Sequence, residues 1–518
     1  MKILKQSKSA IQKYVLLWAF PALLFLSACS TNTNNTAASC GSAQFSIVDY
    51  GALDDGETLN TKSIQSAIDA CSEAGGGMVV IPAGRFFSGT IILKNSVELH
   101  LARGATLLGS FNQSDYPDQP HGEYRALRDS DGFNSLIYAQ GAEDIAITGY
   151  GTIDGQGRLH KRLSEIPEGQ RDNRPRGIMF VSCKNIVIRD VRMQSSSFWM
   201  QHYLNCEDVF IDNIRVINHS NSNNDGLNVD GCRRVLISNC NIDTEDDCIV
   251  LKSTGKAMSE DIVITNCIVS TYTNAIKAGT ETTGGFRNIT ISNCIVRPSR
   301  YTEHRIYDGP ATGLTGIALL IVDGGTMEGV TINNMVIDGP PAPIYIRLGN
   351  RARKHIDGAP EPPVGKIQNI SISNVVAHSA RNYTSSIEGM AGHPIRDISF
   401  NNIQFFTLGG VDEGDYSTDI MEDDKAYPER DLPLMPASGL FLRHVDGISI
   451  TNMVIGAEEK DVRFPIWAED VSNLLVSDCR LSGGVRTDIF VKGIGLTNYI
   501  VDKPVGWTGK RKLVQLSN

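Results

Sequence analysis

The sequence predicts an all-β chain wound into a right-handed parallel β-helix, with a short helix capping its N-terminal end. Three observations support this fold: a strand motif that recurs along the chain, a base period near 26 residues, and cysteines that repeat in the same register. A length of 518 residues could hold several ordinary domains, but a solenoid has no such size limit because each coil packs only on its neighbours. A hydrophobic content of 41% argues against disorder.

The strand motif starts with a turn-forming residue and continues with alternating β-branched residues. Its first residues are Asp144, Asn185, Asp208, Arg234, Asp261, Asn288, Gly329, Asn369, Asp397, Gly447 and Asn473. A period near 26 is too short for a βαβ unit, which needs about 30 residues or more. It suits one coil of a β-helix whose Ile and Val residues point inward on every second position. The longer spacings, of 40 to 50 residues, predict coils that carry inserted loops.

Cysteines repeat in step with the strands. Cys240, Cys267 and Cys294 are 27 residues apart, and each follows Ser-Asn or Thr-Asn. Equivalent positions on neighbouring coils lie about 4.8 Å apart, so we expect an internal ladder of small apolar side chains. Thiolate metal ligands usually come in close pairs such as CxxC, and we therefore predict no metal site. Disulfides among the ten cysteines that follow Cys29 remain open.

The first ordered element is predicted to be a helix over residues 61–74. Ile64, Ala67, Ile68 and Cys71 share one face, and Asn60 or Thr61 is the expected N-cap. A helix at this point would cover the open end of the solenoid and protect its edge from pairing with other chains.

The N-terminal segment is typical of export. A basic stretch precedes an apolar run over 14–26, which is too short to span a bilayer, and Leu26-Ser27-Ala28-Cys29 resembles a bacterial lipobox. We predict a signal peptide over 1–28, lipidation of Cys29, a flexible tether over 29–44 and a β-helix domain over 45–510. An ordinary signal peptide is the alternative. The expected location is the cell surface or periplasm, as an outer-membrane lipoprotein that contacts the membrane only through its lipid.

Composition restricts the partners. A formal net charge of −10 argues against nucleic acid as the main partner, but it leaves room for an anionic polysaccharide bound in a locally positive cleft. We expect a monomer that needs no cofactor.

Three aspartates form the sharpest chemical signal. Asp225 lies 21 residues before Asp246, slightly less than one coil, so both can project from one face. Asp246 and Asp247 precede an apolar strand, where adjacent acids repel each other unless function compensates. Glycoside hydrolysis needs one carboxylic acid to protonate the leaving oxygen and a second carboxylate to activate water or attack directly. Clustering carboxylates raises the pKa of one of them. The ordinary alternative is a set of solvated surface charges.

The same segment resembles glycoside hydrolase family 28, the polygalacturonases and their relatives. The residues that carry the resemblance are Asn223-Asn224-Asp225-Gly226, Asp246-Asp247-Cys248 and Ser197-Phe198-Trp199-Met200-Gln201-His202. The resemblance implies a pectin-lyase-like solenoid and inverting hydrolysis without a metal. It further implies that Asp246 is the general acid, that Asp225 and Asp247 hold and deprotonate the water, and that Asn223 helps to fix the site geometry.

Two departures from the family pattern concern substrate binding. Asn274 stands where many relatives carry the His of Gly-His-Gly, and the apolar stretch 316–318 replaces Arg-Ile-Lys. Other basic residues could replace this carboxylate clamp, and our candidates are Lys252, Lys277, Arg347 and Arg351, with a solvated charged loop as the alternative for the two arginines. We expect Trp199 to be a core aromatic, and His202 and His393 to be structural.

These observations and the resemblance favour a hydrolase of a galacturonic-acid-containing polysaccharide or oligosaccharide, inverting by the resemblance. We expect exo action rather than endo action, because the inserted loops could close one end of a groove. Rhamnogalacturonan or another uronic-acid polymer is the alternative substrate. A polysaccharide lyase and a non-catalytic glycan-binding surface protein are the competing functions.

Overall fold

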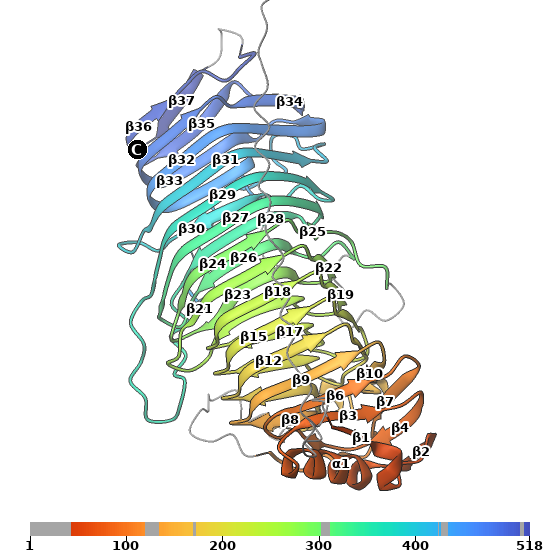
Figure 1. The fold of residues 1–518 in the computed structure, drawn as a ribbon. Coiled ribbons are helices and arrows are strands. Elements are labelled where there is room, and N and C mark those ends of the chain that lie inside the picture. Colours follow the sequence, from red (N-terminus) through yellow and green to blue (C-terminus); the bar gives the residue numbers. More distant parts are fainter. Residues whose placement is uncertain are drawn as a thin grey trace, which may run out of the picture. The chain divides into compact units, whose positions relative to one another are not determined.

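The fold is a parallel β-helix, as the repeat predicts (Figure 1). A computed structural model describes residues 43–119, 134–168, 172–301, 311–422, 424–425, 434–507 and 512–517. Every coil contributes strands that pair in parallel with the coils before and after it. The pairings form three stacks, named A, B and C below, that surround one continuous apolar core. Residues 1–42 lie outside the described residues, so the predicted signal peptide, most of the tether and Cys29 are not placed.

The bounds of the strands follow the three stacks. Stack A holds β1 (Gln44–Ser46), β3 (Gly77–Ile81), β6 (Val97–Leu101), β9 (Glu143–Gly149), β12 (Lys184–Arg189), β15 (Glu207–Asp212), β18 (Arg233–Ser238), β21 (Ser259–Thr265), β24 (Phe286–Ser292) and β36 (Thr497–Val501). Stack B holds β2 (Asp55–Leu59), β4 (Gly84–Ser88), β7 (Ala105–Gly109), β10 (Thr152–Asp154), β13 (Arg192–Gln194), β16 (Arg215–Asn218), β19 (Asn241–Thr244), β22 (Ile268–Thr271), β25 (Ile295–Val296) and β34 (Arg480–Val485). Stack C holds β5 (Ile91–Ile92), β8 (Ser135–Gln140), β11 (Arg176–Val181), β14 (Gln201–Leu204), β17 (Leu227–Asp230), β20 (Ile249–Ser253), β23 (Asn274–Thr282), β26 (Thr315–Ile321), β28 (Ala342–Leu348), β30 (Ser385–Glu388), β35 (Ile489–Ile494) and β37 (Lys512–Ser517).

Later strands continue through the corners between stacks. β27 (Thr326–Gly339), β29 (Lys366–Ser379) and β31 (Ile395–Thr407) each serve stacks A and B. β33 (Phe464–Ser477) serves stacks C and A, and β32 (Ala437–Asp461) serves all three. The stack therefore runs past residue 510, because β37 pairs with β35 and covers its edge.

Left-handed backbone explains the residue types of the repeat. Every motif-initiating residue from Asp144 to Asn473 has a positive φ, and so has the residue five positions later, for example Asn185 with Asp190 and Asn288 with Asn293. Only Gly, and to a lesser extent Asn and Asp, adopt this conformation at low cost. The two left-handed residues bracket the four residues of a straight stack A segment. These left-handed residues thus form the two corners that flank stack A in each coil.

The N-terminal helix and the cysteines lie where the sequence places them. Helix α1 (Thr61–Glu73) buries Ile64, Ala67, Ile68 and Cys71 at the N-terminal end of the solenoid (Figure 1). Asn60 is its N-cap residue, although its side chain bonds Leu53 instead of capping the helix.

The repeating cysteines form the expected internal ladder. Cys240, Cys267 and Cys294 are at most 2% exposed and stack on consecutive coils. The nine cysteines among the described residues are all free thiols. The described part of the chain contains no cluster of three His, Cys, Asp or Glu residues arranged to hold a metal ion, and no helix there is long and apolar enough to cross a membrane.

Candidate active site

The three aspartates meet at the entry to stack C. Leu227 pairs with Ile249, which pairs with Ile276, so Asp225, Asp247 and Asn274 occupy equivalent positions on three consecutive coils. Neighbouring strands lie about 4.8 Å apart, which brings these side chains together. The backbone pairing confirms the register, since Gly226 N donates to Asp247 O at 3.0 Å.

A network of amides shapes the loop before Asp225. The side-chain oxygen Oδ1 of Asn224 accepts from Ser220 N at 2.7 Å and Asn221 N at 2.6 Å, and its side-chain nitrogen Nδ2 donates to Ser196 O at 3.0 Å. Gly226 follows because a side chain would not fit: a Cβ there would lie 2.6 Å from the carbonyl oxygen of Cys248. These contacts explain the Asn-Asp-Gly sequence as a local packing requirement.

Asp247 is surrounded by donors. Its Oδ1 accepts from Asn274 Nδ2 at 2.7 Å and Thr273 Oγ1 at 2.9 Å, and its Oδ2 lies 2.8 Å from Lys277 Nζ. Burial on its own would raise the pKa of Asp247, but Lys277, together with Lys252 and the Asn274 amide, lowers the pKa below its ordinary value. Asp247 is therefore an ionised carboxylate near neutral pH.

The other two aspartates hold their protons more tightly. Burial and the neighbouring Asp247 carboxylate raise the pKa of Asp246, and burial together with Asp246 raises the pKa of Asp225 well above its ordinary value. Asp246 is half-buried, whereas Asp225 is 3% exposed. The cluster thus combines one carboxyl group whose pKa is lowered with two whose pKa values are raised.

This combination suits acid–base chemistry. A proton donor and an ionised base beside each other are the two groups that hydrolysis of a glycosidic bond requires. Asn223 links Asp246 to Arg174: its Nδ2 lies 3.4 Å from Asp246 Oδ2, and its side-chain oxygen Oδ1 accepts from Arg174 Nη2 at 3.1 Å.

The basic candidates divide into two groups. Lys277 and Asn274 contact Asp247 directly, and Lys252 lies one strand away with its Nζ 3.0 Å from Glu281 Oε2. The structure does not bring Arg347 to the aspartates: it pairs with Glu388 at 2.8 Å on the later strands β28 and β30.

Arg351 and Lys252 both lie near Glu281. Arg351 forms an ion pair with Asp323 and lies 3.9 Å from Glu281, the partner of Lys252. It is therefore positioned to act on the site through Glu281.

The expectation that Trp199 is a core aromatic is wrong. The pairing of β14 with β17 places Trp199 one coil before Asp225 at the equivalent position, and its ring is half-exposed. Lys252 Nζ lies 4.9 Å from the ring centroid. Trp199 therefore lies outside the solenoid core, next to Lys252 and one coil before Asp225.

The two histidines stay apart from the reacting groups. His202 is fully buried, with its Nε2 3.4 Å from Asp230 Oδ2. His393 is exposed in a tight turn, where it bridges to Met390.

Sequence reasoning missed three contributors. Arg174, held by Asp172 at 2.7 Å, donates to Ser222 O at 2.6 Å and to Asn223, and it comes from a loop about 50 residues earlier. Thr273 bonds both Asp246 and Asp247, and the hydroxyl next to Asn274 was its only signal. Glu245 is fully buried beside Asp246, and burial together with the Asp246 charge raises its pKa to about 9.

Comparison with known families gives a match over most of the chain. The model described as "Glycosyl hydrolases family 28" matches residues 71–420. The chain is 34% identical over 227 residues to a probable polygalacturonase of Vitis vinifera, covering 42% of this chain and 46% of that protein. It is 40% identical over 133 residues to an exo-poly-alpha-D-galacturonosidase of Dickeya chrysanthemi, covering 24% of this chain and 22% of that protein. The alignments thus span less than half the length of these relatives.

Solved structures share the fold. An exopolygalacturonase from Thermotoga maritima superposes with a TM-score of 0.59 at 23% identity, covering 70% of this chain and 87% of that one. A family 28 exopolygalacturonase from Yersinia enterocolitica gives 0.59 at 20% identity, covering 89% of this chain and 79% of that one. At these identities the likeness concerns the β-helix itself.

Proposed function

Because this chain belongs to glycosyl hydrolases family 28, we propose that it hydrolyses glycosidic bonds in a galacturonic-acid-containing polysaccharide or oligosaccharide, in the exo mode and with inversion of configuration. The observation that carries the proposal is the geometry of the aspartates: Asp225 and Asp247 occupy equivalent positions on adjacent coils, with Asp246 beside them. The names of the matched relatives support galacturonan as the substrate class.

The pKa directions assign the roles. Asp246 retains its proton and donates it to the leaving glycosidic oxygen, while ionised Asp247 removes a proton from the attacking water. Asp225, with its raised pKa, positions this water by hydrogen bonding, and Asp247 alone is the base in the resting protein. This division refines the expectation that both residues deprotonate the water.

The cations around the base have a second use. Lys252 and Lys277 face the same carboxylates from the open side of stack C, where they would also attract the carboxylate of a uronate. Arg347 and Arg351 are engaged with Glu388 and Asp323, and we propose that they contribute to substrate binding through the field they create.

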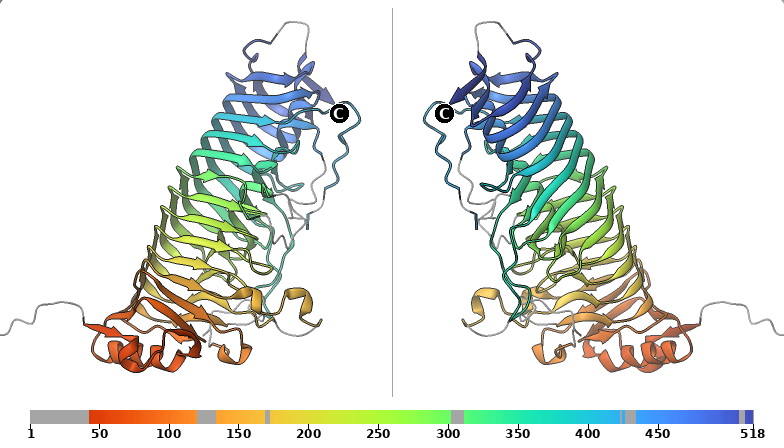
Figure 2. Two further views of the ribbon diagram at one scale, coloured as in Figure 1. Left: turned by 90° about the vertical axis from the view of Figure 1, so that its right-hand side faces the viewer. Right: turned by 90° about the vertical axis from the view of Figure 1, so that its left-hand side faces the viewer.

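A long segment between β31 and β32 supports exo action. Phe441 and Trp467 belong to the outer face of stack C, and Ile420 of this segment packs against them. The segment is held by Arg443, which donates to Ile420 O at 2.8 Å, and by Asp424, whose carbonyl oxygen accepts from Asn350 N at 2.6 Å. It therefore covers stack C toward the C-terminal coils, which limits the length of sugar chain that this face can hold. Figure 2 shows chain segments outside the strands running along one long side of the solenoid.

The test is a conservative change of the proton donor. Asp246→Asn keeps the shape of the side chain and removes the acid, so the release of reducing ends from polygalacturonate should fall by at least about 100-fold. Asp261→Asn is the matched control, because Asp261 is exposed and occupies a left-handed position that Asn accepts. Unchanged turnover in a folded Asp246→Asn protein would refute the proposal. Exo action predicts that monomers or dimers are the only small products from the first minutes.

A second substrate has one specific observation in its favour. The stretch 316–318 is apolar, and Ala318 follows Lys277 in register on the next strand. Ala318 is fully buried, so this coil offers no cation for a second uronate next to Lys277, which favours rhamnogalacturonan or another mixed uronic-acid polymer. A substrate panel with product masses distinguishes the two.

Export as a lipoprotein remains a proposal from the sequence. Metabolic labelling with a fatty acid should mark the wild-type chain and leave Cys29→Ala unlabelled.

A further inference from the structure

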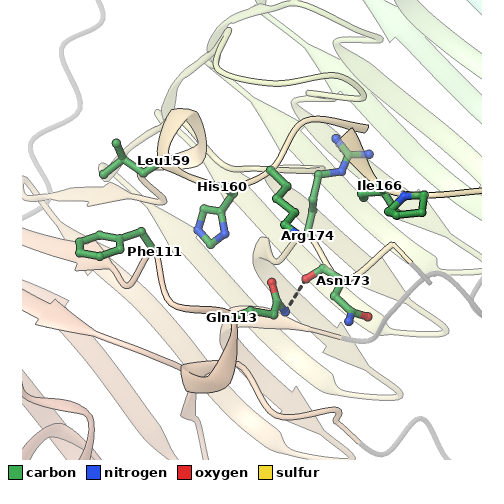
Figure 3. A pocket seen from close by; sticks show the side chains of 9 residues that line it. Phe111, Gln113, Leu159, His160, Ile166, Asn173 and Arg174 are labelled. Atoms are coloured by element: carbon green, nitrogen blue, oxygen red, sulfur yellow. Dashed lines mark hydrogen bonds between the residues drawn. The ribbon is translucent and has the colours of Figure 1, made fainter. Parts of the chain in front are cut away.

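A pocket formed by segments of the earlier coils shares Arg174 with the hydrogen-bond network around the aspartates. It has a volume of about 250 Å³ and is lined by segments around Phe111, Leu159–Lys161 and Asn173–Arg174 (Figure 3). Two bonds connect it to the reacting groups: Arg174 bonds Asn223, which contacts Asp246. Asn221, four residues before Asp225, also donates to Lys161 O at 3.0 Å. The pocket and the catalytic loop are therefore parts of one hydrogen-bonded framework.

His160 gives the pocket an unused polar atom. Its side chain is buried, with 7% of the residue exposed, and its Nε2 has no hydrogen-bond partner among the described residues. Burial lowers the pKa of His160 to about 4, so the imidazole is neutral at neutral pH. A buried polar atom without a hydrogen bond is destabilising, and a ligand hydroxyl that bonds it would remove this cost.

The rest of the lining matches a sugar acid. The exposed side chains of Phe111 and Leu159 offer apolar surface to the C–H groups of a pyranose ring, and Lys161 supplies an exposed ammonium group without an ion pair in the described chain. Gln113 Nε2 donates to Asn173 O at 2.7 Å, which fixes these two lining residues relative to each other (Figure 3). The guanidinium of Arg174 is fully engaged with Asp172 and backbone oxygens and acts as a wall.

We propose that this pocket binds the terminal uronate of the substrate, with His160 Nε2 bonding a ring hydroxyl and Lys161 pairing with the carboxylate. The inference rests on the proposed hydrolase function and adds the residues that select a charged end unit. A pocket that recognises the terminal unit would fix the distance between the chain end and the bond that is cleaved.

The experiment compares kinetics of three variants on trigalacturonate. Lys161→Ala and His160→Gln should each raise KM about 5- to 20-fold with kcat nearly unchanged, because the lost contacts stabilise substrate and transition state alike. Arg162→Ala is the matched control: it removes the same charge from the next, exposed residue, which does not line the pocket, and its KM should equal that of wild type. Methyl esterification of the terminal carboxylate should abolish the difference between wild type and Lys161→Ala.

The outcomes separate the two proposals. Absence of wild-type turnover on all galacturonides would overturn the hydrolase function itself. Wild-type turnover, combined with KM values for Lys161→Ala and His160→Gln that equal the Arg162→Ala value, would overturn the pocket proposal and leave the function standing. Because Lys161 is exposed, its variant keeps the test valid even if His160→Gln folds poorly.

Discussion

Replacing Lys277 by methionine should move the acidic side of the pH–activity profile to higher pH. Lys277 Nζ lies 2.8 Å from Asp247 Oδ2, and the two side chains are 11% and 9% exposed. At an effective dielectric constant of about 20, Coulomb's law gives about 6 kcal/mol at this separation, before the cost of desolvating both charges. The bonds from Asn274 and Thr273 remain, but the loss of the Lys277 charge should raise the pKa of Asp247.

The sign follows from the role of the base. Asp247 must be ionised to accept a proton, and kcat/KM therefore falls as the pH drops through its pKa. A higher pKa means that activity is lost at a higher pH. The alkaline side, set by the proton on Asp246, should also move to higher pH, because Lys277 lowers the pKa of Asp246 as well. The assay is the pH dependence of kcat/KM, which reports the free enzyme. Lys492→Met on β35, another lysine of stack C, is the control. An acidic limb that does not move in folded Lys277→Met would refute the assignment of Asp247 as the base.

Three further predictions concern stability and the catalytic loop. Gly226→Ala should lower the free energy of unfolding by about 1–3 kcal/mol or abolish activity, because the new Cβ would lie 2.6 Å from Cys248 O. Thermal unfolding measures the loss of stability, and turnover measures the loss of activity. Arg234→Asn should raise the unfolding free energy by up to about 1 kcal/mol, since Asn accepts the positive φ and the exposed ion pairs with Glu207 and Asp208 contribute little; a lower melting temperature would contradict this. Glu245 keeps its proton in the folded chain up to about pH 9, so stability should fall as the pH rises from 4.5 to 9, and Glu245→Gln should flatten this loss; equal slopes in the two proteins would contradict it.

The fold could be predicted because its determinants are local and periodic. Each coil repeats the same left-handed corner residues, and the corners space the inward-facing Ile and Val residues. The same periodicity placed Asp225 and Asp247 on adjacent coils, because residues that are about one coil apart in the sequence align in neighbouring strands.

The partners of long side chains could not be predicted. Arg347 meets Glu388 rather than substrate because two loops of unequal length separate their strands, and only the folded register aligns them. Arg174 reaches Asn223 from an irregular loop that carries no period. Trp199 lies just before β14, where the inside–outside alternation of a strand does not apply, so the sequence does not indicate which way its ring points.

If Asp246 and Asp247 catalyse a single displacement by water, hydrolysis inverts the configuration of the anomeric carbon. Proton NMR of the first minutes of hydrolysis, before the anomers equilibrate, measures this configuration. We expect a new reducing end whose anomeric configuration is opposite to that of the bond cleaved. A product with the original configuration, or an unsaturated sugar formed by elimination, would contradict it.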